Sequence, residues 1–352
     1  MSFNFYGKEF SRNMKPYVIA EIGHNHQGDF NKAEELIKLA KETGANCVKF
    51  QKKDVDNLYT KKMLNSFYTS PDSFGETYGQ HKKHLEFSIE QMKELKEYAE
   101  QLGLDFLCTA FDFNSADQLN TIGVQGYKVG SCDLINTPLI CYIASFLKPV
   151  FLSTGASIIP EIDKAIEAIE RYHSNYVLFH CISSYPCEYK QLNLSFIGKL
   201  LCRYPNAVIG YSGHESGILA PIIGYMLGAT VFEKHFTFNH AAKGTDHKFS
   251  LEPHGMHSLV RDLHRISESL GDGEKGLQEW ELAARKKLGK SLYVYGNVHS
   301  GDTISLENVS IKAPGVDGIA PYELDNILGK RYNRDMIEEE PITWDVINDK
   351  IS

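Results

Sequence analysis

Short apolar runs alternate with amphipathic helical segments through residues 17–270. The apolar runs are rich in β-branched and aromatic residues, and the segments between them space their apolar positions as a helix does. This alternation is typical of parallel strands that helices cover on both faces. We therefore expect eight strands, at residues 17–20, 45–50, 105–109, 126–129, 150–153, 176–181, 207–211 and 230–235.

The helical segments carry recognisable start and stop signals. Residues 31–43 place their apolar side chains on one face and are followed by Gly44, whereas residues 88–102 begin with Ser88. Eight strands alternating with helices fit either a closed barrel or a doubly wound open sheet. No GxGxxG motif follows the first strand, and polar residues gather at the C-terminal ends of nearly all the strands. We therefore predict an α/β fold, a (β/α)8 TIM barrel.

The character of the sequence changes after about residue 272. A helical stretch comes first, and then short alternating runs are broken by Gly, Pro and Asn. This pattern indicates a small β-rich domain with turns. We assign residues 1–271 to a TIM-barrel catalytic domain, residues 272–290 to a linker and residues 291–352 to the C-terminal domain.

Composition narrows the class of protein. The 352 residues are 42% hydrophobic and 23% charged, as in an ordinary globular protein, and the net charge of -8 argues against nucleic-acid binding. The seven cysteines are odd in number and form no CxxC motif, which favours free thiols in a reducing compartment. The first residues lack the apolar core of a signal peptide, and no apolar run approaches the length of a membrane span. We therefore expect a cytoplasmic protein that binds neither nucleic acid nor membrane.

Polar residues mark the C-terminal ends of the predicted strands and the segments that follow them. In a barrel these ends converge on one mouth, where active sites form. The candidate site residues are Glu21, Lys49, Gln51, Thr109, Lys128, Ser131, Asp133, Ser153, Ser183, Tyr185, Ser212, His214, Glu233, His235 and Asp246.

The residue types in this set indicate three kinds of chemistry. Lys49 and Lys128 lie in apolar strands, where an unpaired lysine is costly, so we expect an anionic ligand beside them. Two histidines on consecutive strands, His214 and His235, are suited to one divalent metal with open positions for an oxygen ligand. The carboxylates are suited to orienting hydroxyl groups or moving protons. Lys128 is alternatively suited to forming a Schiff base, as in lyases of this fold.

A set of motifs in a fixed order resembles the N-acetylneuraminate (sialic acid) synthase family over nearly the full chain. The motifs are AEIG at 20–23, VKFQ at 48–51, YKVGS at 127–131, STG at 153–155, GYSGH at 210–214, EKHFT at 233–237 and GTD at 244–246. The segment 73–87, which includes His81, Lys82, Lys83 and His84, looks like the animal enzymes that use a phosphorylated sugar. The resemblance implies that an antifreeze-like (SAF) domain follows the barrel. It also implies a domain-swapped homodimer, in which that domain reaches the partner's active site.

The resemblance also implies a reaction and a role for each residue. Phosphoenolpyruvate would condense with N-acetylmannosamine, its 6-phosphate or a related hexose to give a nine-carbon 2-keto sugar acid and phosphate. His214 and His235 would bind the metal, usually Mn²⁺, with Mg²⁺ or Co²⁺ as alternatives. The catalytic residues would be Glu21, Lys49, Lys128 and Asp246, and the other substrate-binding residues would be Gln51, Thr109, Ser131, Asp133, Ser153, Ser183, Tyr185 and Ser212.

Two positions depart from the family pattern, and two other functions stay open. Ala313 stands where many bacterial members carry an arginine that reaches the N-acyl group of the sugar, so the acceptor sugar is not fixed by the sequence. Cys132 replaces the usual glycine after Ser131. The alternative functions are a metal-independent aldolase or lyase that uses Lys128, and a non-catalytic carbohydrate-binding or structural protein.

Overall fold

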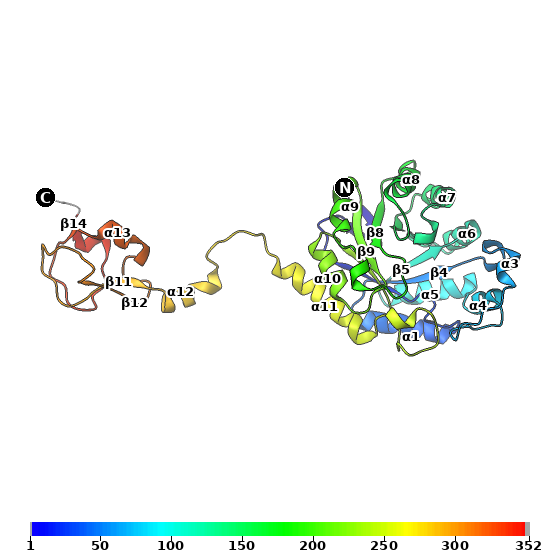
Figure 1. Cartoon of the computed structure of the whole chain (residues 1–352), viewed down its shortest axis with the longest axis horizontal. Helices are drawn as coiled ribbons and strands as arrows, with labels where there is room; N and C mark the ends of the chain where they lie inside the picture. Colours follow the sequence, from blue (N-terminus) through cyan, green and yellow to red (C-terminus); the bar gives the residue numbers. More distant parts are fainter. Residues whose placement is uncertain (1, 349–352) are drawn as a thin grey trace. The chain divides into compact units, whose positions relative to one another are not determined.

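The computed structural model describes residues 2–348 and divides the chain into two compact units, Met1–Gly271 and Asp272–Ser352 (Figure 1). The first unit contains the eight parallel strands and most of the helices. The second is a small β-rich unit. Each unit has a hydrophobic core of its own.

The first unit is a closed eight-stranded parallel barrel, which confirms the predicted TIM-barrel fold. Each strand hydrogen-bonds to the next strand in the chain, and the last strand pairs with the first, so the sheet has no free edge. The barrel strands are β3 (Tyr17–Glu21), β4 (Cys47–Lys52), β5 (Asp105–Ala110), β6 (Tyr127–Val129), β7 (Val150–Ser153), β8 (Tyr176–Cys181), β9 (Val208–Gly213) and β10 (Val231–His235).

Helices connect the strands and cover the outside of the barrel (Figure 1). The predicted helix 88–102 begins as expected, because Ser88 and Gln91 form a capping box in which each side chain accepts from the other residue's backbone N–H. The helices of this unit are α1 (Phe30–Glu42), α2 (Val55–Leu58), α3 (Lys61–Leu64), α4 (Tyr78–His84), α5 (Ile89–Gln101), α6 (Phe113–Thr121), α7 (Thr137–Ser145), α8 (Ile159–Glu170), α9 (Phe196–Arg203), α10 (Leu219–Met226) and α11 (Pro253–Ser269).

The register of the strands sets polar residues side by side at the C-terminal mouth of the barrel. Glu21 at the end of β3 lies opposite Lys49 of β4 on one side and His235 of β10 on the other. On the next strands, Thr109 lies opposite Lys128. The backbone pairing of the strands alone therefore makes residues that are far apart in the chain neighbours in the sheet.

An aromatic hairpin packs against the opposite, N-terminal end of the barrel. Its two strands are β1 (Phe3–Phe5) and β2 (Lys8–Phe10), and its phenylalanines join a buried cluster with residues of the barrel interior such as Phe151. Phe10 is fully buried, and its ring centroid lies 4.8 Å from that of Tyr17. Lys8 also forms an ion pair with Asp105 at the start of β5. The hairpin thus adds packed aromatic area under the polar mouth.

The second unit pairs β11 (Ser291–Val294) with β12 (Val309–Lys312), and β13 (Arg331–Tyr332) with β14 (Ile347–Asn348). These antiparallel pairs and α13 (Leu324–Ile327) surround a small apolar core. Before β11 the chain forms α12 (Leu282–Leu288), as the helical stretch in the sequence indicated. This unit is the predicted β-rich C-terminal domain.

Two further features bear on the sequence-based expectations. All seven cysteines are free thiols. Within residues 2–348, no helix is both long enough and apolar enough to span a membrane.

The packing of the aromatic hairpin leads to a prediction about the stability of the barrel. Replacing Phe10 by alanine leaves a cavity among packed rings, so we expect the barrel to lose about 3–5 kcal/mol of its free energy of unfolding. Urea unfolding followed by circular dichroism measures this change. The matched control is Phe67→Ala, because the Phe67 side chain is 83% exposed and its removal is expected to cost less than about 0.5 kcal/mol. Equal losses of unfolding free energy in the two variants would show that the aromatic hairpin does not stabilise the barrel.

Candidate active site

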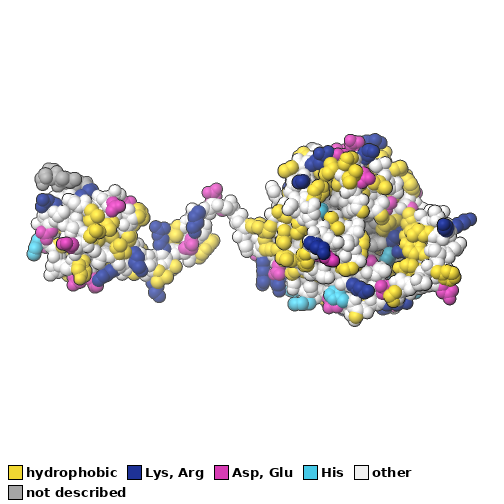
Figure 2. Space-filling model, viewed as in Figure 1, with side chains coloured by type: hydrophobic (Ala, Val, Ile, Leu, Met, Phe, Trp, Pro, Cys, Tyr) yellow, Lys and Arg dark blue, Asp and Glu magenta, His cyan; other side chains and the backbone are white. Residues whose placement is uncertain are grey.

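A cavity of about 740 Å³ opens at the C-terminal mouth of the barrel. Figure 2 shows the hollow in the barrel unit, with basic and histidine side chains in its wall. The cavity is lined by all but one of the residues predicted for the site, the exception being Asp133. They are Glu21, Lys49, Gln51, Thr109, Lys128, Ser131, Ser153, Ser183, Tyr185, Ser212, His214, Glu233, His235 and Asp246.

A buried ion pair occupies the floor of this cavity. The Nζ atom of Lys49 lies 2.9 Å from Oε2 of Glu21 and 3.6 Å from Oε1 of Glu233, and it donates to Oγ1 of Thr109 at 3.0 Å. Burial disfavours the charged amine, but the two carboxylates outweigh it and hold the pKa of Lys49 above its usual value. Lys49 is therefore a fixed positive charge that also holds the carboxylate of Glu21 in place.

A second lysine faces a cluster of hydroxyl groups. Lys128 donates to Oγ of Ser153 at 2.6 Å and to the carbonyl of Val129, and no carboxylate of the described residues lies within ion-pair distance of it. Burial lowers its pKa, and the negative charge of Glu233 opposes part of that effect. A positive side chain among hydroxyl groups, with no counter-ion of its own, is suited to receiving an anion.

A close backbone approach completes this cluster. The N–H of Gly155 donates to Oγ of Ser131 at 3.0 Å. A side chain at position 155 would collide with the hydroxyls of both Ser131 and Ser183, so only glycine allows these two serines to approach the same point. We call the group formed by Lys128, Ser131, Ser153, Gly155 and Ser183 the anion cradle.

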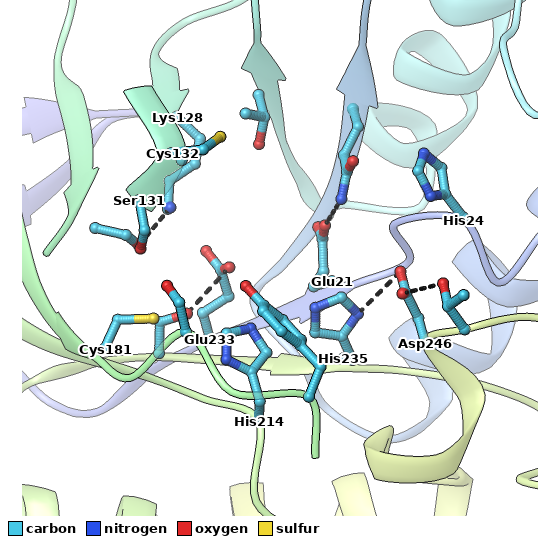
Figure 3. Close-up of a pocket in the computed structure, with 18 of the residues that line it drawn as sticks. Glu21, His24, Lys128, Ser131, Cys132, Cys181, His214, Glu233, His235 and Asp246 are labelled. Carbon is cyan, nitrogen blue, oxygen red and sulfur yellow. Dashed lines mark hydrogen bonds and ion pairs between the residues drawn. The ribbon is translucent and has the colours of Figure 1, made fainter. Parts of the chain in front are cut away.

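The two predicted metal ligands lie side by side. The rings of His214 and His235 have centroids 5.5 Å apart (Figure 3). Phe249 packs against both rings. The Nδ1 atom of His214 lies 3.0 Å from the carbonyl oxygen of Ile182, which fixes the ring and leaves Nε2 free of that bond. Burial, with a contribution from His235, lowers the pKa of His214 to about 3, so at neutral pH its imidazole is uncharged, as a metal ligand must be.

The residues present fit a divalent cation with few protein ligands. The buried Nδ1 atom of His235 has no hydrogen-bond partner among residues 2–348, although Oδ2 of Asp246 lies 3.7 Å from it. The described residues do not form a group of three or more histidine, cysteine or carboxylate ligands around one point. Two imidazoles alone would leave most coordination positions to oxygen atoms of substrate or water.

Two carboxylates border the histidines. Oδ1 of Asp246 accepts from the hydroxyl of Thr245 at 2.8 Å, and Figure 3 shows Asp246 beside His235. Oε1 of Glu233 accepts from Ser212 at 3.3 Å, while its buried Oε2 has no hydrogen-bond partner among the described residues. Burial raises the pKa of Glu233, but Lys128 and Lys49 outweigh it, so the pKa stays below its usual value. Both groups are thus suited to accepting hydrogen bonds from a ligand.

Asp133 lies outside the lining of the cavity. Its carboxylate accepts from Asn136 at 3.2 Å and from the thiol of Cys132 at 3.4 Å, within the short turn that leads into α7. These contacts give Asp133 a local structural role, and its contact with a sugar stays a prediction. Cys132, which departs from the family pattern, does line the cavity.

Sequence reasoning missed Lys53, which belongs to a basic region on another part of the wall. Lys53, His24 and Lys82 line the cavity together with Tyr59 and Phe111. Nothing in the sequence separated Lys53 from its neighbour Lys52. The available signal was a Lys-Lys doublet at the end of β4, which is ambiguous because a strand alternates its side chains between inside and outside.

The segment that resembles animal enzymes contributes one side chain to this cavity. Of the four basic residues at 81–84, only Lys82 lines it. His81 is buried, and its Nδ1 atom accepts a hydrogen bond from the backbone N–H of Phe74. The ring of His84 stacks on the ring of the same phenylalanine. Lys83 points elsewhere and pairs with Asp56 at 2.6 Å.

The chain matches two family models and several known proteins. The NeuB family model matches residues 36–275, and the SAF domain model matches residues 289–347. The chain is 35% identical to N-acetylneuraminate-9-phosphate synthase of Homo sapiens, covering 94% of this chain and 92% of that protein. It is 36% identical to N,N'-diacetyllegionaminic acid synthase of Legionella pneumophila, with 95% of each chain covered.

A solved structure supports the same fold. The crystal structure of N-acetylneuraminic acid (sialic acid) synthetase from Leptospira borgpetersenii, in complex with citrate, matches with a TM-score of 0.71 at 32% identity. The match covers 81% of this chain and 95% of that one.

The anion cradle generates a binding prediction. In Gly155→Ala the added methyl group collides with Ser131 and Ser183, so we expect the Kd for phosphoenolpyruvate to rise roughly tenfold or more, given a clash of about 1–3 kcal/mol. Titration calorimetry measures this constant. The control is Gly198→Ala in α9, where a methyl group would meet nothing within 4 Å. An unchanged Kd in a folded Gly155→Ala protein would show that the anion binds elsewhere.

Proposed function

Because the chain belongs to the NeuB family of phosphoenolpyruvate-dependent nonulosonate synthases, we propose that it condenses phosphoenolpyruvate with the aldehyde of an N-acylated hexosamine. The product would be a nine-carbon 2-keto sugar acid, and inorganic phosphate would be released. Relatives of comparable identity are named for different nonulosonic acids, so the identity of the sugar is part of this proposal.

One observation carries the proposal: the anion cradle and the histidine pair open into one cavity. Lys128 and Ser131 lie on one side of the cavity, and His214 and His235 lie on another (Figure 3). A condensation needs this arrangement, because the anionic nucleophile and the aldehyde must meet while the phosphate stays held. A site that only bound a carbohydrate would not need a buried lysine without a counter-ion.

The reaction steps follow from these positions. The C3 carbon of phosphoenolpyruvate attacks the aldehyde carbon, so a C–C bond forms, the aldehyde oxygen takes up a proton to become a hydroxyl group, and positive charge develops at C2. Water adds to C2 and loses a proton, which balances the one taken up by the aldehyde oxygen, and phosphate then leaves by cleavage of its C–O bond. Lys128 and the serines of the cradle hold the phosphate, and Lys49 adds a second positive charge nearby. Glu21 would accept the proton of the attacking water, since its carboxylate is held between Lys49 and Gln51.

His214 and His235 would hold a divalent cation, which we propose is Mn²⁺, with Mg²⁺ or Co²⁺ as alternatives. Bound there, such a cation supplies Lewis-acid polarisation of a carbonyl oxygen. Phe249 packs against both rings and Tyr185 against that of His214, and both histidines line the cavity into which the substrates would bind.

The C-terminal unit has a proposed role in assembly. We propose that the chain forms a homodimer in which the SAF domain of one chain covers the active site of the other, with residues 272–290 as the linker. Ala313 would then leave recognition of the N-acyl group to other residues.

An activity assay tests the proposed function. Incubating the protein with phosphoenolpyruvate, Mn²⁺ and a panel of hexosamines, phosphorylated and not, is expected to release phosphate and form a 2-keto acid. EDTA is expected to abolish the release, and His214→Ala is expected to lower kcat at least about a hundredfold, because removing a metal ligand weakens metal binding as well as catalysis.

Two outcomes would contradict this proposal. No phosphate release with any acceptor of the panel would exclude the synthase reaction. Activity that resists EDTA, together with trapping of a keto acid on Lys128 by borohydride, would instead establish the Schiff-base aldolase.

A further inference from the structure

Four buried polar side chains hold the loop that joins β10 to α11, residues 236–252, without lining the cavity. Each is at most 2% exposed, and together we call them the buried clamp: Asn25, Thr237, His247 and Ser250. The loop begins directly after His235 and carries Asp246. Whatever holds this loop in place therefore also sets the positions of two side chains that do line the cavity.

The amide of Asn25 uses both of its N–H donors on this loop. Its Nδ2 atom donates to the backbone carbonyl of Phe236 and to Oγ of Ser250, in each case at 2.8 Å. Its Oδ1 atom has no hydrogen-bond partner among the described residues, so the two donated bonds are what orient the side chain. Asn25 thus connects the residue that follows His235 to the other end of the same loop.

The hydroxyl of Ser250 extends this connection to Asp246. Because Oγ of Ser250 accepts from Asn25, its single proton is directed to a different acceptor, and it donates to the backbone carbonyl of Asp246 at 2.6 Å. Ser250 also follows Phe249, whose ring packs against both histidines of the pair. Two consecutive hydrogen bonds therefore join Asn25 to the backbone that carries Asp246.

A second pair of contacts closes the loop. Oγ1 of Thr237 lies 2.7 Å from Nδ1 of His247, the residue that follows Asp246. At the base of the loop, the backbone N–H of Leu251 donates to the carbonyl of His235 at 2.7 Å. The backbone beside His235 and the backbone beside Asp246 are thus both fixed by hydrogen bonds away from the cavity.

The side chains held in this way meet at one point of the site. Oδ2 of Asp246 lies 3.7 Å from Nδ1 of His235 (Figure 3), which is too long for a hydrogen bond, so these two side chains do not fix each other. A Cβ atom added at Gly23 would lie 3.2 Å from Oδ2 of Asp246 and 3.2 Å from Oε1 of Glu21. It would also lie 3.4 Å from Cε1 of His235, so the three side chains surround the same small space. Their relative position depends on the backbone that carries them.

We propose that Asn25 is a positioning residue for this site. By holding Phe236 and Ser250 it keeps His235 and Asp246 in the relation that cation binding and the condensation require. The inference rests on the proposed synthase function and its divalent-cation site. Groups that orient metal ligands from behind typically change metal affinity or activity about tenfold to a hundredfold when they are removed. A buried hydrogen bond that contributed to stability alone would leave both quantities unchanged in a folded variant.

The test measures Mn²⁺ binding and turnover in the full-length protein. Asn25→Leu keeps a side chain of similar size but has no N–H donors, so we expect the Kd for Mn²⁺, measured by titration calorimetry, to rise about tenfold or more. We expect kcat to fall about tenfold to a hundredfold. The KM for phosphoenolpyruvate is expected to change less than about twofold, because the anion cradle shares none of these contacts.

Ser250→Ala is the second variant if Asn25→Leu does not fold. It removes only the connection to Asp246 and leaves the bond from Asn25 to Phe236, so we expect a smaller loss in the same direction. Ser250→Thr keeps the hydroxyl group, and it is expected to restore the Mn²⁺ affinity and kcat close to those of the wild type.

Thr43→Val is the matched control for stability. It removes one buried hydroxyl that donates to a backbone carbonyl, that of Ala40, at 2.7 Å, and Thr43 lies at the C-terminal end of α1. We expect Thr43→Val and Ser250→Ala to lower the Tm by similar amounts, about 2–4 °C. Only Ser250→Ala is expected to weaken Mn²⁺ binding and lower kcat.

The inference and the proposed function can fail separately. Wild-type Mn²⁺ affinity and kcat in the folded variants of Asn25 and Ser250, or equal losses in Thr43→Val, would overturn the positioning role and leave the synthase intact. If no acceptor sugar were turned over, the synthase would fail, and weaker Mn²⁺ binding in Asn25→Leu but not in Thr43→Val would still support the positioning role. A wild type that bound no divalent cation would overturn the inference together with the metal site.

Discussion

In a closed parallel barrel each strand is hydrogen-bonded on both sides, so its register cannot shift without moving every neighbour. This constraint sets Glu21 between Lys49 and His235, residues from three strands that are distant in sequence. A shift of one residue would turn Glu21 out of the mouth and leave Lys49 buried without its partner. The fold therefore fixes the charge pattern of the site, and the aromatic hairpin at the other end of the barrel supplies packing that the polar mouth cannot.

Burial of charge connects stability to binding in this protein. Lys234 and Glu215 are both fully buried, and each neutralises the charge of the other. Glu215 directly follows His214 in the sequence, and Lys234 directly precedes His235. The amine of Lys234 also donates to the backbone carbonyl of Glu215, which ties the end of β9 to β10. The pair thus holds the segment that carries the two histidines. Lys128, in contrast, has no such partner, and its charge is neutralised only when an anion binds.

Most of the fold and of the cavity lining could be predicted from the sequence. Eight apolar runs define the barrel strands, and in a parallel barrel the residues at their C-terminal ends must converge, which is why Lys49, Thr109 and Lys128 were found. Lys53 was not found because it and Lys52 are the same residue type in adjacent positions. The two lysines differ in the folded protein because the carboxylate of Glu86 forms an ion pair with the side chain of Lys52, whereas it accepts a hydrogen bond only from the backbone N–H of Lys53. A sequence pattern records where a charge is, but it does not record which charges are already paired.

Gln51 shows how the site keeps two opposite charges close without letting them neutralise each other. Its amide Nε2 donates to Oε1 of Glu21 at 2.8 Å, and its Oε1 accepts from Lys53 at 2.7 Å. A carboxylate at this position would pair with Lys53 and repel Glu21, and an apolar side chain would remove one hydrogen bond from each. The neutral amide instead satisfies one hydrogen bond of each while adding no charge. Glu21 therefore keeps its ion pair with Lys49, and the charge of Lys53 remains available to a ligand on its own side of the cavity.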